Sequence, residues 1–307
     1  MNKINKLVLT VISACIMLCG CDIKMETPDN TEDTLPVIAT TEVSEESEPE
    51  PQPFPVTING VAIEKAPERV ASLSPSLTEI IYEMGYGDRL VGKGSYCDFP
   101  EEVSLITDIG RPSKPDINTI ISLSPEILFT ATSIPLKDQY KLEENGIKTI
   151  YIPYPSTIEE FGRIYSALGM VFEGAFDGEA TGMNCFSSIE DAFTSAQIDL
   201  GSFVYITEGL TVATGDTFEH SVLSAFGENI GEPGVDYGYK KEYLVEFQPD
   251  LILLNGNYTI DDLLSDEVYS QLTAVVNGNV YSLDNTYFER PSGRITELIE
   301  SLKDIGC

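Results

Sequence analysis

Aromatic and arginine side chains gather in loops that follow predicted strands, and they carry the most evident chemistry of the sequence. Aromatic faces beside a few hydrogen-bonding groups suit a large, partly flat organic ligand, and arginine donates hydrogen bonds to oxygen atoms. Packing in the core or at a rim explains any single tyrosine equally well, so only the set as a whole predicts a site. The side chains expected to contact the ligand are Tyr96, Ile109, Arg111, Thr211, Tyr237, Tyr239, Thr286, Tyr287, Phe288, Glu289 and Arg290.

Covalent catalysis has no candidate residues in this sequence. The motifs Gly-x-Ser-x-Gly and His-Glu-x-x-His and the P-loop are absent, and the only histidine is His220. A serine without a nearby histidine lacks the base that would activate it. One histidine is also too few for a histidine-rich metal site. We therefore expect a binding protein with no catalytic residue, no metal site and no cofactor of its own.

Residues 68–100 predict the start of an α/β lobe. A short buried strand leads to a serine cap, Ser74 or Ser76, and Glu79 stands at the capping-box spacing from Ser76. The helix that follows is expected to stop at Gly85, and a second strand and an aromatic loop come next. In lobes of this kind the ligand-binding loops follow the strands.

Two parts of the sequence have the same plan. Residues 116–130 and 240–254 each fit a short helix, a corner with proline and a buried strand. In both cases a helix, an Asn-Gly pair and a β-branched strand follow, and three matching elements in one order predict two similar lobes. Alternating strands and helices predict mostly parallel sheets. The expected fold class is therefore α/β, with two Rossmann-like lobes joined by a long rigid helix.

The segment between the lobes is expected to be helical. Thr157–Leu168 places apolar side chains at helical spacing, and a further helix fits residues 174–195. About 22 helical residues span roughly 33 Å at 1.5 Å per residue. Such a strut limits hinge motion and favours a cleft that changes little when a ligand binds.

The first residues fit an export and anchoring signal. Lys3 and Lys6 precede an apolar run from Leu7 to Leu18, which is shorter than the roughly 20 residues that span a bilayer. The run ends Leu18-Cys19-Gly20-Cys21, which resembles a bacterial lipobox, so Cys21 is expected to carry the lipid and begin the mature chain. An ordinary secretory signal with incidental cysteines is the alternative.

Residues 22–55 have the composition of a disordered tether. They hold ten acidic residues, one lysine and almost no aromatic residue, so they cannot bury enough apolar surface to fold. As a random coil such a segment reaches roughly 30–35 Å. The whole chain has a formal net charge of −32, which opposes binding to the phosphates of nucleic acids.

The predicted organisation has five segments. They are a lipoprotein signal peptide at 1–21, the tether at 22–55, a first α/β lobe at 56–156, a helical linker at 157–200 and a second α/β lobe at 201–307. Three cysteines remain after removal of the signal and lipidation, and the sequence leaves open whether any of them pair. These cysteines are Cys97, Cys185 and Cys307.

Four segments resemble the substrate-binding proteins of ABC importers for cobalamin and ferric siderophores. They are ERVASLSPSLTEIIYEMG at 68–85, SYCDFP at 95–100, the GRP and DINTIISLSPEILF parts of 110–129, and NTYFERPSGRITELIESL at 285–302. The resemblance covers about residues 66–307. It implies two Rossmann-like lobes, a rigid helical linker, a ligand between the lobes, and docking onto a membrane permease.

Residue by residue, the resemblance places Tyr96 against a corrin ring and residues 287–290 in the ligand loop. Thr286 stands where the cobalamin-binding members have an acid, and Ile109 stands where they have a tryptophan.

The same family docks its permease through an acid on each lobe. Glu242 matches this acid in the second lobe, and Asn118 occupies the matching place in the first. Asp116 or Glu126 is therefore expected to take over that role in the first lobe.

The sequence thus predicts a lipid-anchored receptor on the outer face of the cell membrane, in an envelope of the Gram-positive type. It is expected to be a monomer that captures a cobalt corrinoid or an iron chelate and delivers it to an ABC permease and its ATPase. One alternative is a receptor for haem or a metal ion. Another is a ligand-sensing surface domain that works without a transporter. A surface hydrolase is disfavoured because no nucleophile–base pair is present.

Overall fold

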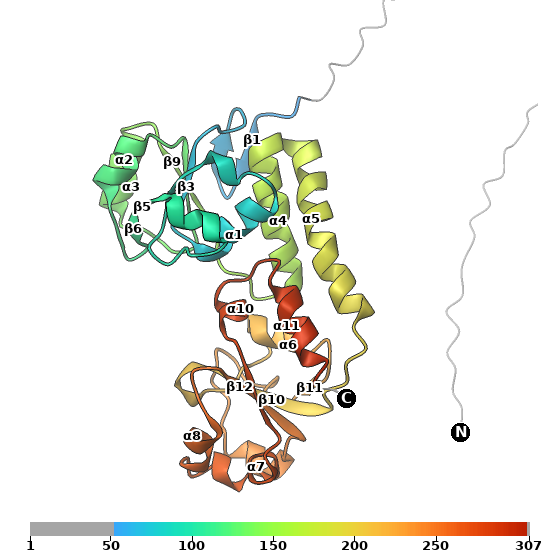
Figure 1. Cartoon of the computed structure of the whole chain (residues 1–307). Helices are drawn as coiled ribbons and strands as arrows, with labels where there is room; N and C mark the ends of the chain where they lie inside the picture. The colour runs from blue at the N-terminus through green and yellow to red at the C-terminus, as the bar shows by residue number, and fades with distance from the viewer. Residues whose placement is uncertain (1–51, 306–307) are drawn as a thin grey trace, which may run out of the picture. The chain divides into compact units, whose positions relative to one another are not determined.

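The structure, a computed structural model, describes residues 52–305. The predicted signal peptide, the lipidation site Cys21, the tether up to residue 51 and Cys307 lie outside the described residues. The described residues form two α/β lobes joined by a pair of helices, and Figure 1 colours them from blue in the first lobe to red at the end of the second. The predicted fold class is confirmed.

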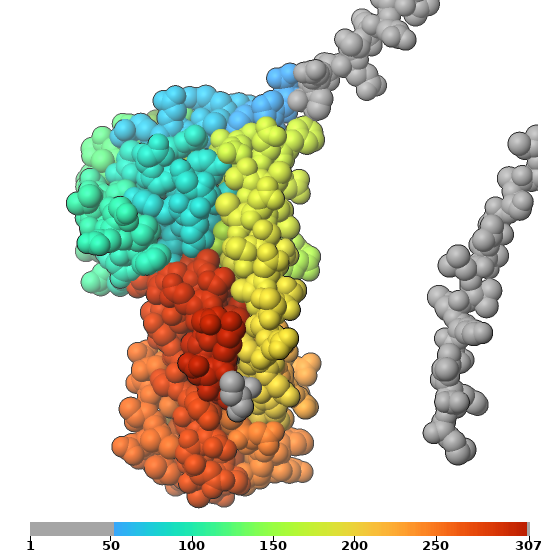
Figure 2. All heavy atoms as spheres, turned by 45° about the vertical axis from the view of Figure 1, so that its right-hand side comes forward, coloured from blue at the N-terminus to red at the C-terminus, as the bar shows by residue number. Residues whose placement is uncertain are grey.

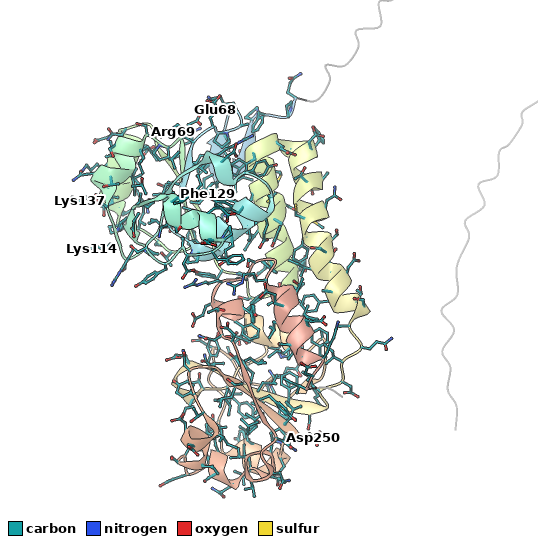
Figure 3. All side chains as sticks on the ribbon, in the orientation of Figure 1. Glu68, Arg69, Lys114, Phe129, Lys137 and Asp250 are labelled. Atoms are coloured by element: carbon teal, nitrogen blue, oxygen red, sulfur yellow. The ribbon has the colours of Figure 1, made fainter. Side chains whose placement is uncertain are left out.

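The first lobe is built on a parallel sheet of five strands in the order β5-β4-β3-β8-β9. The strands are β3 (Val70–Ser72), β4 (Leu90–Lys93), β5 (Thr107–Asp108), β8 (Ile127–Thr130) and β9 (Lys148–Tyr151). Helices α1 (Pro75–Glu83), α2 (Ile117–Leu123) and α3 (Leu136–Glu143) connect them. Phe129 of β8 is fully buried, and Figure 3 shows it inside this lobe.

Helix α1 begins at a predicted serine but lacks the predicted capping box. Ser74 is the N-cap residue, and its hydroxyl accepts a hydrogen bond from the amide of Leu77 at 3.4 Å. The carboxylate of Glu79 instead accepts a hydrogen bond from Ser292 of the second lobe at 2.6 Å. The capping-box prediction for Glu79 was therefore wrong, because this side chain ties the lobes together. The helix ends before Gly85, as predicted, and Gly85 has a φ of 84°.

The second lobe repeats this topology with four parallel strands in the order β11-β10-β12-β13. These strands occupy the places of β4, β3, β8 and β9 of the first lobe. The bounds are β10 Ser202–Ile206, β11 Glu228–Asn229, β12 Leu251–Asn255 and β13 Val280–Leu283. The helices are α6 Phe218–Leu223, α7 Tyr243–Phe247, α8 Ile260–Leu264, α9 Thr273–Asn277, α10 Thr286–Glu289 and α11 Ile295–Leu302.

The corner that repeats in the sequence has the same backbone in both lobes. Ser124 follows α2 and Gln248 follows α7, and both are left-handed, with φ values of 49° and 51°. Each stands before a proline, which disfavours continuation of the helix. Gly146 and Gly278 of the paired Asn-Gly turns have φ values of 76° and 77°. The two lobes therefore share turns as well as strand order.

Short elements complete the lobes. The hairpin of β1 (Val56–Ile58) and β2 (Val61–Ile63) opens the first lobe, and β6 (Gly110–Arg111) pairs with β7 (Lys114–Pro115). Short 3-10 helices occupy Gly87–Arg89, Glu101–Leu105, Glu208–Leu210 and Tyr269–Gln271.

The connector is a hairpin of two helices, so the predicted strut is doubled. Helix α4 (Ile158–Glu173) and helix α5 (Ala175–Ser195) lie side by side. A Cβ atom on Gly169 would overlap the carbonyl oxygen of Gly178, and one on Gly182 would overlap the carbonyl oxygen of Tyr165. The 21 residues of α5 span about 31 Å. In Figure 2, α5 is a yellow column that reaches from the first lobe to the second.

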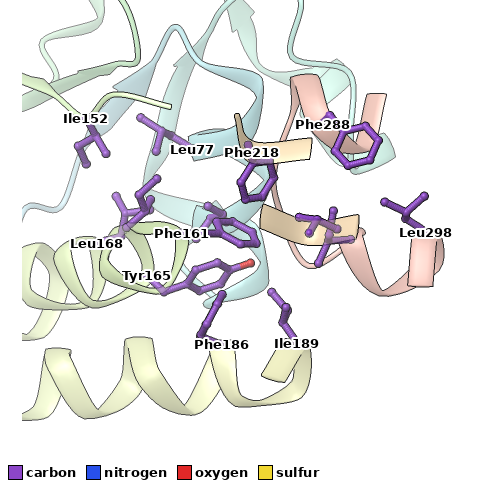
Figure 4. Close-up of a cluster of buried hydrophobic side chains, with 14 of the residues drawn as sticks. Leu77, Ile152, Phe161, Tyr165, Leu168, Phe186, Ile189, Phe218, Phe288 and Leu298 are labelled. Carbon is purple, nitrogen blue, oxygen red and sulfur yellow. The ribbon is translucent and has the colours of Figure 1, made fainter. Parts of the chain in front are cut away.

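One apolar core continues from the first lobe through the connector into the second. Figure 4 shows Leu77 of α1, Phe161 of α4 and Phe186 of α5 together with Phe218 of α6 and Leu298 of α11. The ring centroid of Phe161 lies 5.3 Å from that of Phe186 and 5.6 Å from that of Phe218. Two smaller apolar clusters belong to one lobe each.

Candidate functional site

A large cavity lies between the lobes, at the carboxyl ends of their parallel strands. Its volume is about 1160 Å³, which exceeds the roughly 300–1,000 Å³ of ordinary small-molecule sites. Arg69 and Asp250 stand before β3 and β12, at the opposite ends of the strands, and Figure 3 shows them away from this space. The site therefore has the position expected for parallel α/β sheets, where ligands bind beyond the carboxyl ends.

The first lobe gives the cavity an uncharged wall. Tyr96 lies in the loop after β4 and Tyr154 in the loop after β9, and both are more than two-fifths exposed. The guanidinium of Arg111 lies outside the lining, 5.6 Å from the ring centroid of Tyr96. The remaining lining residues of this lobe are Pro75, Pro112, Pro155 and Ser156.

Tyr205 and Phe288 form the aromatic part of the opposite wall. Tyr205 comes from β10 and Phe288 from α10, and their ring centroids lie 5.2 Å apart. Burial raises the pKa of the Tyr205 hydroxyl, so this group stays protonated and can donate a hydrogen bond.

Tyr237 is held at the cavity by a backbone that few residues adopt. Asp236 and Tyr237 are consecutive left-handed residues, with φ values of 51° and 58°. The carboxylate of Asp216 fixes this turn, because it accepts hydrogen bonds from the amide of Asp236 at 2.9 Å and from the hydroxyl of Thr214 at 2.6 Å. The Tyr237 hydroxyl lies 3.2 Å from each carboxylate oxygen of Glu219 and donates to this group. Such strained backbone persists where the surroundings fix it, and it clusters at functional sites.

Carboxylates make up much of the second-lobe wall. Burial raises the pKa of Glu219, whereas the hydrogen bond from Thr214 lowers the pKa of Asp216. Among the described residues that line the cavity, Arg290 is the only cationic one, and it pairs with Asp98 of the first lobe. The acids of this wall are Glu208, Asp216, Glu219, Asp236 and Glu289.

The cavity brings together six of the residues predicted from the sequence. They come from loops of both lobes that are far apart along the chain, and Arg290 also spans the gap between the lobes through Asp98. The six residues are Tyr96, Thr211, Tyr237, Phe288, Glu289 and Arg290.

Five predicted residues lie elsewhere. Ile109 is fully buried in the core of the first lobe, and Arg111 stacks on Tyr96 from outside the lining. Tyr239 packs against Tyr243, with ring centroids 6.1 Å apart. The hydroxyl of Thr286 donates to Asp284 at 2.7 Å, and the hydroxyl of Tyr287 donates to Glu297 at 3.1 Å.

Fifteen of the 21 lining residues are absent from the predicted set, and among them are four with hydroxyl or carboxylate groups on the second-lobe wall, namely Tyr205, Glu208, Asp216 and Glu219. Tyr205 stands in an apolar strand and is 1% exposed, so the sequence gives it the pattern of a core residue. Glu208 follows β10 closely, and the rule that loops after strands bind ligands could have identified it. Asp216 stands just before the short helix α6, and Glu219 is in its first turn. Only the tertiary fold brings these two side chains to the cavity.

The corner between α10 and α11 fastens the second lobe to α1. The Ser292 hydroxyl donates to Glu79 at 2.6 Å, and the amide of Gly293 donates to Glu83 at 2.8 Å. Tyr165 of α4 also donates to Glu83, at 2.6 Å. Burial raises the pKa of Glu79 to about 7 and raises the pKa of Glu83. The junction on one side of the cavity is therefore a polar cluster between the lobes, in which Glu79 and Ser292 are buried and Glu83 is exposed.

The two acids predicted to face a permease each stand at the start of a short helix, although Asn118 rather than Asp116 has the register of Glu242 relative to the corner that follows. Asp116 is the N-cap residue of α2 and Glu242 that of α7, and both are exposed. The amide and hydroxyl of Thr119 donate to Asp116 at 3.1 and 2.9 Å, and these bonds lower the pKa of Asp116. Glu126 is instead engaged within its own lobe, where it pairs with Lys65 at 3.0 Å.

Cys97 and Cys185 are free thiols, and burial raises the pKa of each. Within residues 52–305, no three histidine, cysteine, aspartate or glutamate side chains are grouped so that they could hold a metal ion. In the same part of the chain, no helix has the length and apolar character needed to cross a membrane.

Comparisons with known proteins agree on one family. The family model described as periplasmic binding protein matches residues 70–287. The chain is similar to an uncharacterized ABC transporter substrate-binding lipoprotein of Bacillus subtilis, YvrC, with 23% identity over 314 residues that cover 96% of this chain and 94% of that protein. It is also similar to the vitamin B12-binding protein of Photorhabdus laumondii, with 26% identity over 252 residues that cover 78% of this chain and 90% of that protein.

Among solved structures, the fold resembles that of the periplasmic heme binding protein HutB of Vibrio cholerae. The TM-score is 0.65 at 18% sequence identity, and the match covers 77% of this chain and 98% of that one.

Proposed function

The chain belongs to the periplasmic binding protein family, and from this premise we propose that it captures a corrinoid or a ferric siderophore between its lobes and hands it to an ABC importer. Substrate-binding proteins of such importers act with a permease and an ATPase. The receptor needs no covalent chemistry, because capture and release of the ligand are its whole task.

The observation that carries this proposal is the interlobe cavity of about 1160 Å³ with aromatic side chains on both walls. Tyr96 and Tyr154 from the first lobe face a space that Tyr205, Tyr237 and Phe288 line from the second. Rings on two sides suit a broad ligand that is held between flat faces. A corrinoid has the size and the partly flat form that this space accommodates, and a ferric hydroxamate has a comparable bulk.

The predicted lipid at Cys21 completes the proposal at the other end of the chain. Acyl chains on Cys21 would hold the receptor on the outer face of the cell membrane, and the acidic segment 22–55 would act as its tether. The name of the Bacillus subtilis relative, a substrate-binding lipoprotein, supports this arrangement.

Docking onto the permease is assigned to the exposed acids Asp116 and Glu242. Their places at the starts of α2 and α7 give each lobe one exposed anionic point. Arginine side chains on a permease would pair with both points at once.

The first test is titration calorimetry of the purified chain with cyanocobalamin, dicyanocobinamide, haemin, ferrioxamine B and a ferric tris-catecholate. We expect saturable binding of at least one corrinoid or siderophore with one ligand per chain. Absence of binding to every compound would refute the proposal.

A substitution then places the ligand in the cavity. Tyr96→Ala should weaken binding more than tenfold, about 1.4 kcal/mol, because Tyr96 offers its exposed ring to the ligand. Tyr140→Ala is the matched control, since Tyr140 is an exposed tyrosine of α3 that does not line the cavity. If the two variants bind the ligand with equal affinity, the ligand does not contact Tyr96 and the binding site lies elsewhere.

A further inference from the structure

The two walls of the cavity differ in charge. The first-lobe wall consists of tyrosine, proline and serine residues and carries no charged side chain. The second-lobe wall holds five carboxylates and one guanidinium, so its formal charge is −4 when all these groups are ionised. A ligand between the lobes therefore meets a neutral aromatic face on one side and an anionic face on the other.

The single cation of the lining does not offset this charge. Arg290 is paired with Asp98 of the first lobe, so its positive charge is already matched by a carboxylate outside the lining. None of the five lining acids forms an ion pair within residues 52–305. Their hydrogen-bond donors are neutral groups, such as the Tyr237 hydroxyl beside Glu219 and the Thr214 hydroxyl beside Asp216.

We infer that this receptor selects ligands that carry no negative charge, and that the ligand presents hydrogen-bond donors or a positive charge to the second-lobe wall. The inference rests on the proposed function and narrows its substrate class. An amide-bearing macrocycle such as a corrinoid, or a cationic ferric hydroxamate, meets this requirement. Haem with its two propionates and a trianionic ferric catecholate do not.

Desolvation strengthens this selection. When a ligand fills the cavity it displaces water, and charges in the remaining low-dielectric space interact more strongly than in bulk solvent. A ligand carboxylate beside Asp216 or Glu219 would then be repelled, and it would also lose its own hydration without gaining a cationic partner. A primary amide at the same place donates to the carboxylate, and a charge-assisted hydrogen bond of this kind is stronger than a neutral one.

The test compares pairs of ligands whose main difference is charge. One pair is cyanocobalamin and its monocarboxylic acid, in which one peripheral amide has become a carboxylate. The other pair is ferrioxamine B, which has an ammonium group, and its N-succinyl derivative, which ends in a carboxylate. For the parent compound that binds, we expect the carboxylate derivative to bind at least tenfold more weakly at low salt. Added salt should narrow this ratio, because it screens the repulsion.

Variants then assign the effect to the wall. The double variant Asp216→Asn, Glu219→Gln should bring the ratio of the two dissociation constants toward one. The single variant Glu208→Gln should lower the ratio as well, and it provides a second measurement if the double variant folds poorly. Glu179→Gln with Asp191→Asn, two exposed acids of α5 outside the cavity, is the matched control and should leave the ratio unchanged.

The outcomes separate this inference from the proposed function. A carboxylate derivative, haemin or a ferric tris-catecholate that binds as tightly as the uncharged or cationic parent would overturn the charge selection and leave the receptor function intact. The charge selection would also be refuted if the Asp216 and Glu219 substitutions left the ratio of the two dissociation constants unchanged. Failure of every compound to bind would refute the receptor function, and the charge selection with it.

Discussion

Glu79 should make the stability of this protein depend on pH between about 4.5 and 7. Its side chain is 1% exposed and joins α1 to Ser292 and, at 3.9 Å, to Arg294 of the second lobe. One of its carboxylate oxygens has no hydrogen-bond partner. Burial is the main cause that raises its pKa from 4.5 to about 7. The ionised form is thus disfavoured in the folded state despite the nearby guanidinium.

The sign follows from proton counting. Between the unfolded pKa of 4.5 and the folded pKa of about 7, the folded chain keeps a proton that the unfolded chain releases. Stability from this group therefore falls as pH rises through that window and becomes constant above it. A shift of this size corresponds to about 3 kcal/mol of unfolding free energy. Glu79→Gln removes the titration and retains an oxygen that can accept from Ser292.

The assay is urea unfolding of the wild-type chain and of Glu79→Gln at several pH values from 4 to 8. We expect similar stability at the lowest pH and a growing advantage of the variant, up to about 3 kcal/mol, at pH 8. Glu159→Gln is the control, because Glu159 is an exposed glutamate in an ion pair with Arg163, and its loss should cost under about 1 kcal/mol. Parallel stability curves for wild type and Glu79→Gln would refute the reasoning.

Two further predictions concern the connector. Gly178→Ala should lower the melting temperature by several degrees, because the new methyl group would overlap the backbone of α4 at Gly169, whereas Glu179→Ala on the exposed face of α5 should change it little. Tyr165→Phe should cost about 0.5–1.5 kcal/mol in urea unfolding, because it removes the hydrogen bond that the buried Tyr165 donates to Glu83; an unchanged free energy of unfolding would show that water or another donor replaces this hydroxyl at Glu83.

Local signals in the sequence were enough to predict the two-lobe fold. The paired corners at Ser124 and Gln248 and the paired Asn-Gly turns repeat in the same order in both halves, and the structure confirms that they build sheets of the same strand order. The amphipathic pattern also located both connector helices. The hairpin between them was not predicted, although Gly178 and Gly182 stand four residues apart on the face of α5 that contacts the backbone of α4.

The site was harder to predict, because whether a residue lines the cavity depends on the tertiary structure and not on the local sequence. A loop after a strand places a residue near the site, but the side-chain direction decides whether it lines the space. Ile109 shows this limit, since it stands in a predicted loop and yet points into the core. Glu219 shows the converse, since nothing in its neighbourhood along the chain distinguishes it from the many other acids of the sequence.

The apolar core that both lobes share should determine how the receptor unfolds. Phe161 of the connector packs on Phe218 of the second lobe, and the same apolar cluster includes Leu77 of the first. If either lobe unfolded alone, it would expose apolar core residues of the other lobe to water. We therefore expect heat or denaturant to unfold both lobes in a single cooperative transition. A ligand bound between the lobes would therefore stabilise both lobes. Scanning calorimetry should show one unfolding peak, and the ligand should shift that peak to a higher temperature.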